Sequence, residues 1–173
     1  MHILFVCTGN ICRSPTAERL ATAYAREMSI ANLRASSAGT RAVIGHPMHP
    51  KSANVLRQLG GDPSNFAARQ LSAKVAASAD LILTMTKKHR DQVLEVSPHK
   101  LNKTFTLGEA SRLTTDFGAA SVSDLAPLRS SLTGSERLDV IDPIGQSTDV
   151  FESVASTIAD LLPPVIALTR VNW

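Results

Sequence analysis

The sequence predicts an α/β fold in which four parallel strands form an open sheet with helices on both faces. Short apolar runs alternate with segments of helical periodicity along the 173 residues, and this alternation is typical of parallel strands joined by right-handed crossovers. The first run, residues 2–6, is almost continuously apolar, as expected for a central strand that is covered on both faces. It leads into a glycine-containing turn at the carboxyl end of the strand, where open α/β sheets bind their ligands.

The first part of the chain predicts two strands and two helices. Behind the turn, Ser14-Pro15 is a suitable helix start, because proline is favoured at the first helical position. Residues 33–37 can form the second strand, and residues 51–59 a second helix that Gly60-Gly61 ends. The first helix carries an apolar face at helical spacing, made of Ala17, Leu20, Ala21, Tyr24 and Met28.

The second part predicts two further strands and two further helices. Residues 81–85 are the clearest later strand, and residues 103–107 form a short fourth one. A helix is predicted over residues 87–96, and another over residues 149–162, where an apolar stripe indicates packing against the sheet and Pro163-Pro164 ends the helix. Residues 119–135, rich in Ala and Ser, are predicted to form a surface excursion.

Composition and charge indicate one globular domain spanning residues 1–173. The chain is 43% hydrophobic and 19% charged, and its formal net charge is +3 without any block of like charges, so we expect a weak preference for anions and no nucleic-acid binding. No run approaches the roughly 18 apolar residues of a membrane span, and a signal-peptide pattern is missing, so we expect no membrane insertion and a cytoplasmic location. The two cysteines, five residues apart, suit a reducing compartment and a catalytic or redox role.

An anion-binding loop with its own nucleophile is indicated directly after the first strand, where the sequence reads Cys7-Thr8-Gly9-Asn10-Ile11-Cys12-Arg13-Ser14. Successive backbone N–H groups in a tight turn form an anion-binding concavity, and the helix N-terminus behind it adds partial positive charge. The Arg13 guanidinium can bind two phosphate oxygens, and the same positive field favours the thiolate form of Cys7 beneath the bound phosphorus. The predicted ligand is phosphate, bound by residues 8–14.

This loop resembles the signature of the low molecular weight protein tyrosine phosphatases, whose catalytic acid lies late in the chain in an Asp-Pro pair. Asp142-Pro143 matches that pair. Further similarity lies in Ser37-Ala38-Gly39-Thr40 and in Asp80-Leu81-Ile82-Leu83-Thr84-Met85. The resemblance covers most of the chain and is weakest over residues 109–138, which are predicted to be an insertion relative to the family.

The resemblance implies a protein phosphatase that acts on phosphotyrosine, or a related phosphorylated residue, through a phosphocysteine intermediate on Cys7. Asp142 is predicted to protonate the leaving oxygen and then to activate water, while Arg13 and the loop amides stabilise the transition states. The proline after Asp142 and the apolar Val140-Ile141 before it favour this aspartate over the nearby Asp139. No metal or cofactor is required, and inorganic phosphate and vanadate are expected inhibitors.

Three other loop residues have two interpretations each. By the resemblance, Asn10 shapes the loop through side-chain hydrogen bonds and Ser14 donates its hydroxyl to the sulfur. From the residue types alone, Asn10 tolerates a positive φ and Ser14 is a helix cap, and both roles are compatible with the first ones. Cys12 can trap an oxidised Cys7 as a reversible disulfide, as the family implies, or can be a small buried apolar residue.

The substrate is the point at which the sequence departs from the family. Phosphotyrosine-specific members have aromatic side chains beside the cleft, whereas this chain offers Val43 or Ile44 in the first place and Ile144 in the second. These aliphatic side chains can still bury a ring, so phosphotyrosine remains the predicted substrate. Phosphoarginine is the alternative, although relatives that hydrolyse it commonly have a smaller polar residue where this loop has Ile11.

Two other functional classes are compatible with the loop. An arsenate reductase would need an electron relay, and with no cysteine beyond Cys12 it would depend on a small thiol. A phosphate-binding module without activity is disfavoured by the intact Cys7, Arg13 and Asp142.

The Lys87-Lys88-His89-Arg90 cluster is predicted to be a solvated helix start. The histidines lack metal-ligand spacing and are predicted at surface or loop positions; they are His2, His46, His49, His89 and His99.

Overall fold

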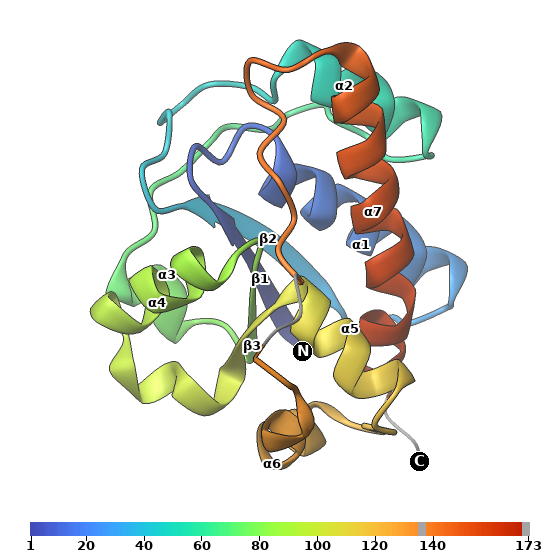
Figure 1. Cartoon of the computed structure of the whole chain (residues 1–173). Helices are drawn as coiled ribbons and strands as arrows, with labels where there is room; N and C mark the ends of the chain where they lie inside the picture. The colour runs from blue at the N-terminus through green and yellow to red at the C-terminus, as the bar shows by residue number, and fades with distance from the viewer. Residues whose placement is uncertain (135–137, 171–173) are drawn as a thin grey trace.

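A four-stranded parallel sheet forms the centre of the protein, in a computed structural model that describes residues 1–134 and 138–170. The strand order is β2-β1-β3-β4, and all neighbouring strands are parallel, as the sequence predicts. Cys7 at the end of β1 lies opposite Gly39 of β2, and Val6 lies opposite Thr84 of β3, so the carboxyl ends of these strands meet at one edge (Figure 1). The strands are β1 (His2–Cys7), β2 (Arg34–Gly39), β3 (Leu81–Thr84) and β4 (Thr104–Thr106).

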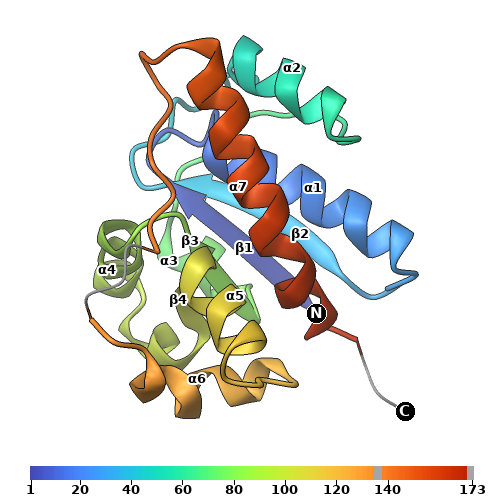
Figure 2. The same cartoon turned by 45° about the vertical axis from the view of Figure 1, so that its right-hand side comes forward.

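Helices cover both faces of the sheet (Figure 2). One face carries α1 (Arg13–Glu27), α2 (Pro50–Gln58), α5 (Leu107–Thr115) and α7 (Thr148–Ala167). The other carries α3 (Ala73–Ala77) and α4 (Lys87–Val96). Short helical segments complete the chain between these elements; they are η1 (Pro98–Lys103), η2 (Val122–Asp124), α6 (Leu125–Leu128) and η3 (Arg129–Ser131).

The central strand β1 is apolar from Ile3 to Val6 because it is buried on both sides. Ile3 and Phe5 pack in the cluster that contains α1, α2, α5 and α7. Leu4 and Val6 point the other way and pack with Val93 of α4. Successive side chains of a strand point to opposite faces, so a strand between two helical layers needs apolar residues at every position. The continuous run that predicted β1 therefore has a direct structural cause.

The predicted end of the last helix at Pro163-Pro164 is wrong, since α7 continues through both prolines to Ala167. A proline inside a helix removes a backbone hydrogen bond and costs stability. The side chains of Val165 and Ile166, directly after the prolines, are fully buried in the core. Burial of two such side chains contributes several kcal/mol, which offsets the loss and extends the helix.

Helix α7 is also long and apolar enough to cross a membrane by length and composition alone. Its buried residues pack in the core beside α1 and α5. A helix of a protein core satisfies the same test of length and hydropathy, so the test alone does not assign α7 to a membrane.

Helix α5 was missed by the sequence analysis although its start carries a clear local signal. The Thr106 hydroxyl accepts a hydrogen bond from the Glu109 amide at 3.0 Å, and the Glu109 carboxylate accepts one from the Thr106 amide at 2.8 Å. This reciprocal pair is a capping box, which satisfies two backbone donors at a helix N-terminus. Leu107 and Leu113 of this helix are fully buried.

The predicted surface excursion over residues 119–135 is wrong where the segment packs on the core, although most of its described residues are partly or fully exposed. Ala119 and Leu125 are buried in the core, and the Arg129 guanidinium lies over the Phe105 ring, 4.0 Å from its centroid. The segment therefore packs on the domain through η2, α6 and η3. Residues 135–137, at the end of the predicted insertion, lie outside the described residues.

Candidate active site

The loop between β1 and α1 has its outer side bound to the segment that follows β2. The carbonyl oxygens of Cys7, Thr8, Gly9 and Ile11 accept hydrogen bonds from backbone amides of that segment, at 2.8–3.0 Å. Since the N–H and C=O of a peptide unit point in opposite directions, these bonds direct loop amides toward the inside of the turn. A side chain at Gly39 would bring a Cβ to 2.4 Å from the Thr8 carbonyl oxygen, so this close approach requires glycine.

The Cys7 sulfur lies at the base of this turn and is hydrogen-bonded to the Ser14 hydroxyl at 2.9 Å. The Asn10 amide nitrogen donates to that hydroxyl oxygen, also at 2.9 Å. Because the oxygen already accepts this bond, the hydroxyl proton is free to point at the sulfur.

Asn10 fills both roles that its residue type allows. Its φ is +56°, in the left-handed region, and its fully buried side chain also donates to the Ser37 hydroxyl at 2.9 Å and accepts from the Arg69 amide at 2.9 Å. The Ser37 hydroxyl in turn donates to the carboxylate of Glu18 at 2.5 Å. Ser37 belongs to a motif that the sequence analysis quoted, whereas Arg69 had no local signal.

Arg13 connects the loop to the segment that contains both candidate aspartates. Its Nη1 donates to the Val140 carbonyl at 3.0 Å, and its Nη2 lies 3.2 Å from the Asp142 carboxylate. The Arg13 side chain is 5% exposed, whereas that of Asp142 is 51% exposed. A buried guanidinium thus keeps the late Asp-Pro segment at the mouth of the loop, with a solvent-accessible carboxylate above it.

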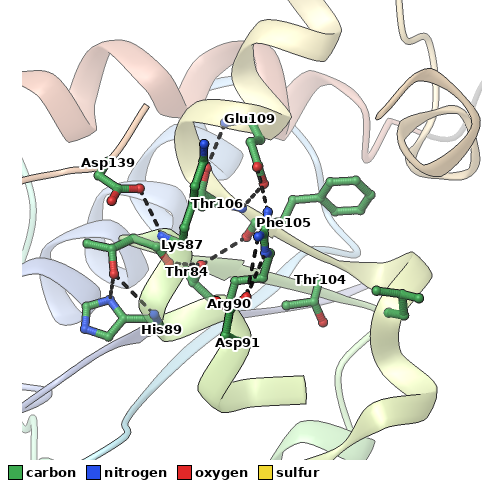
Figure 3. A network of polar contacts seen from close by, with 12 residues as sticks. Thr84, Lys87, His89, Arg90, Asp91, Thr104, Phe105, Thr106, Glu109 and Asp139 are labelled. Carbon is green, nitrogen blue, oxygen red and sulfur yellow. Dashed lines mark hydrogen bonds and ion pairs between the residues drawn. The ribbon is translucent and has the colours of Figure 1, made fainter. Parts of the chain in front are cut away.

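Asp139 has a different place and a structural role. Its carboxylate accepts a hydrogen bond from the Lys87 amide at 2.9 Å, at the first residue of α4 (Figure 3). The neighbouring Val140 amide donates to the Met85 carbonyl at 2.8 Å. These two bonds anchor the segment just before Asp142, because a carboxylate at a helix N-terminus satisfies a backbone donor and the helix dipole.

One cavity of about 390 Å³ brings the loop, Arg13 and Asp142 together. Of the three residues predicted as a substrate wall, Val43 and Ile144 line the cavity, whereas Ile44 is not among the lining residues and is 69% exposed. Arg41, which sequence reasoning missed, lines it too. The lining residues are Cys7, Thr8, Gly9, Ile11, Cys12, Arg13, Arg41, Val43, Asp142 and Ile144.

Cys12 is a buried free thiol in the same loop as Cys7. It packs with Val55 of α2 and Phe151 of α7. Burial raises the pKa of the Cys12 thiol to about 11, although a hydrogen bond with Ser52 opposes the shift. Cys12 is therefore a neutral thiol at physiological pH.

The surface or loop position predicted for the histidines is wrong for two of them. His2 is buried in β1, and His89, in the supposedly solvated basic cluster, is 4% exposed. The His89 ring lies between two hydroxyls, with Nε2 2.8 Å from Thr8 Oγ1 and Nδ1 3.0 Å from Thr86 Oγ1. The physical reason is that α4 turns the first residues of the cluster outward and His89 inward, toward the loop. Across residues 1–134 and 138–170, no group of three or more His, Cys, Asp or Glu side chains could hold a metal ion.

Burial lowers the pKa of His89 from 6.5 to about 4, which makes stability depend on pH. Arg13 and Lys88 lower this pKa further, and Asp139 and Asp142 oppose the shift. Between these two pH values the unfolded chain binds a proton that the folded protein does not, so the free energy of unfolding falls as the pH decreases. Lowering the pH from 7.5 to 5 should thus remove about 2 kcal/mol through this residue.

Urea unfolding of the wild type and of His89→Gln at both pH values measures this contribution. Glutamine does not titrate and can still donate a hydrogen bond, so the acid-dependent loss should be smaller in the variant by about that amount. His99→Gln, at an exposed histidine, should behave as the wild type. Equal acid-dependent losses in His89→Gln and the wild type would contradict the assignment.

Comparisons with known proteins give matches over most of the chain. The family model described as low molecular weight phosphotyrosine protein phosphatase matches residues 2–170. The low molecular weight protein-tyrosine-phosphatase Wzb of Salmonella typhi is 34% identical over 152 residues, which cover 88% of this chain and 83% of Wzb. The solved low molecular weight protein tyrosine phosphatase from T. tengcongensis is similar with a TM-score of 0.77 at 30% identity, covering 96% of this chain and 97% of that one. The YwlE arginine phosphatase from Geobacillus stearothermophilus is similar with a TM-score of 0.73 at 27% identity, covering 95% and 90%.

Proposed function

Because this chain belongs to the low molecular weight protein tyrosine phosphatase family, we propose that it hydrolyses phosphotyrosine on proteins with Cys7 as the nucleophile and Asp142 as the general acid and base. The observation that carries these roles is their meeting in one cavity: the Cys7 sulfur lies at its base, and the Asp142 carboxylate lies at its mouth beside Arg13. An in-line displacement at phosphorus needs an attacking group and a proton donor for the leaving oxygen, and both line this cavity.

In the first step, the Cys7 thiolate attacks phosphorus. An S–P bond forms and the P–O bond to the leaving group breaks, while Asp142 transfers its proton to the leaving oxygen. The inward amides of the loop and the free N–H groups of Arg13 bind the equatorial oxygens, where negative charge is spread in the transition state.

In the second step, water replaces the cysteine. Asp142, now a carboxylate, accepts a proton from the attacking water as its oxygen bonds to phosphorus and the S–P bond breaks. Inorganic phosphate is released and the Cys7 thiolate is restored, stabilised by the hydrogen bond from Ser14. The product and its analogue vanadate should therefore be inhibitors. Catalysis requires Cys7 in its reduced form, which fits a reducing compartment such as the cytoplasm.

The walls of the cavity support an aromatic ester as the substrate. Ile11, Val43 and Ile144 line it with aliphatic groups, which can bury a phenyl ring without stacking on it. Phosphoarginine is the second candidate, since one of the similar structures is an arginine phosphatase. Its strongly polar guanidinium gains less from an aliphatic wall than a ring does.

Hydrolysis of matched peptides that carry phosphotyrosine, phosphoarginine or phosphoserine tests this proposal. We expect the highest kcat/KM for phosphotyrosine. Ile144→Ala should lower kcat/KM for the phosphotyrosine peptide about two- to tenfold, as the loss of a few buried methyl groups does. Ile44→Ala is the matched control and should have little effect. A preference for phosphoarginine would overturn the substrate assignment and leave the catalytic roles intact.

Cys12 supports reversible protection of the nucleophile. Oxidation of Cys7 by peroxide gives a sulfenic acid, which condenses with the Cys12 thiol to a disulfide and releases water; an added dithiol then reduces that disulfide. Because the raised pKa of Cys12 leaves little thiolate at neutral pH, this condensation should become faster as the pH rises.

We expect Cys12→Ser to retain most of its turnover and to lose recovery from peroxide. Activity regained with dithiothreitol after a peroxide pulse is the measurement, with the wild type treated in parallel. Without a resolving thiol, the sulfenic acid is oxidised further to forms that thiols do not reduce. Full recovery in the variant would show that Cys12 does not protect Cys7.

A further inference from the structure

His89 is a buried polar residue that the catalytic steps above do not use. It lies on α4 (Figure 3), on the face of the sheet opposite α1, and its ring contacts the loop through Thr8. Thr8 follows the nucleophile directly and lines the cavity together with Asp142. One face of the Thr8 side chain therefore meets His89, and the residue also borders the space that the substrate enters.

The hydrogen-bond partners of Thr86 determine which His89 nitrogen carries the proton. Thr86 Oγ1 already accepts the backbone N–H of His89 at 3.2 Å. If the Thr86 hydroxyl donates its proton to His89 Nδ1, 3.0 Å away, then this hydroxyl and both ring nitrogens of His89 each have a suitable hydrogen-bond partner. The opposite tautomer would give this hydroxyl oxygen two donors and leave its proton without an acceptor among the contacts of the described residues. Neutral His89 therefore carries its proton on Nε2.

It follows that the Nε2–H group donates to Thr8 Oγ1 across 2.8 Å. The Thr8 oxygen then acts as the acceptor, and its hydroxyl proton is free for a second partner. The cavity that Thr8 lines also contains the phosphate-binding amides and Arg13. An acceptor oxygen of a ligand in this cavity can accept a hydrogen bond from the Thr8 hydroxyl.

We propose that the Thr8 hydroxyl donates a hydrogen bond to an oxygen of the bound phosphoryl group, and that His89 is the positioning residue that orients it. This inference rests on the proposed function, since it adds a side-chain donor to the same phosphate site. Asn10 holds one part of the loop through Ser14 and Ser37, and His89 holds the other part from the opposite face of the sheet. Thr8, the first residue after Cys7, is thus oriented by His89, which does not belong to the loop.

Removal of the hydroxyl without a change of shape is the direct test. Thr8→Val should lower vanadate affinity, measured by calorimetry, and kcat/KM about tenfold each, as expected for the loss of a hydrogen bond to a charged group. Thr8→Ser keeps the hydroxyl and should retain most of both. Thr157→Val removes an exposed hydroxyl on α7 that donates to the Ser153 carbonyl, and it should change neither value.

A double-variant comparison tests the role of His89. His89→Leu should cause the same loss as Thr8→Val, and the two changes combined should cost no more than either alone, because both remove one interaction. His89→Gln, which can still donate to Thr8, should restore part of the loss. If His89→Leu does not fold, the Thr8→Val and Thr8→Ser pair still decides whether the hydroxyl binds the anion.

The outcomes separate this inference from the proposed function. Unchanged vanadate affinity in Thr8→Val, or fully additive effects of the two substitutions, would overturn the inference in an otherwise active phosphatase. A wild-type protein that binds vanadate but hydrolyses none of the phosphopeptides would instead overturn the proposed function.

Discussion

Cys7→Ser is expected to abolish turnover, with a loss of kcat on the order of 10⁴-fold or more, while vanadate still binds. A serine hydroxyl in the same position stays protonated, so the attacking group is lost. The loop amides and Arg13 are unchanged, and the Ser14 hydroxyl can bond to the new oxygen as it does to sulfur. Steady-state kinetics on an aryl phosphate, together with calorimetric titration of vanadate, measures the two properties separately.

Cys12→Ser is the matched comparison, because it makes the same atomic change five residues away in the same loop. It should keep most of its turnover. Substantial hydrolysis by Cys7→Ser would remove Cys7 from the mechanism, and a loss of vanadate binding would show that the sulfur, rather than the loop, carries the affinity.

Asp142→Asn is expected to slow hydrolysis by about 10² to 10⁴-fold for a phenyl ester, since general acid catalysis contributes that much. The loss should be smaller for a nitrophenyl ester, because its leaving group is less basic and needs less help from a proton donor. The ion pair between Asp142 and Arg13 adds a further expectation. A bound anion competes with this carboxylate for the guanidinium, so vanadate affinity should be retained or increased in the variant.

Asp139→Asn is the control for Asp142. Its side-chain oxygen accepts from the Lys87 amide, and an asparagine oxygen can accept the same bond, so turnover should change little. A large loss at Asp139 with little at Asp142 would reverse the assignment of the acid. Equal losses for both esters in Asp142→Asn would contradict proton transfer to the leaving group.

The parts of the site that are contiguous in the sequence could be predicted from it. The loop from Cys7 to Ser14 needs only a strand before it, a helix after it and the right residues between them, and each of these leaves a local pattern. The anchors of that loop could not be predicted in the same way. Asn10 is held by the Arg69 amide and the Ser37 hydroxyl, and neither contact produces a periodicity or a spacing that identifies it.

Errors in the prediction arose where tertiary packing outweighed a local rule. Two prolines normally end a helix, yet α7 continues because Val165 and Ile166 are buried behind them. A run of basic residues normally lies in water, yet His89 turns from the same run into the interior. In both cases the burial of side chains depends on which surfaces the fold brings opposite them, and local sequence does not contain that information.

The sequence by itself determined the parallel sheet and pointed to Cys7 and the loop after it as the candidate nucleophile and phosphate site, because these features depend on neighbouring residues and on alternation of apolar runs. Only the tertiary structure decided that Arg13 reaches Val140, 127 positions away, and so brings Asp142 to the mouth of the cavity. It also decided that Val43 and Ile144 rather than Ile44 line the cavity, and that His89 lies against Thr8. Each of these contacts joins segments far apart in the chain, and their geometry is set by how the strands and helices pack, which no local pattern of residues records.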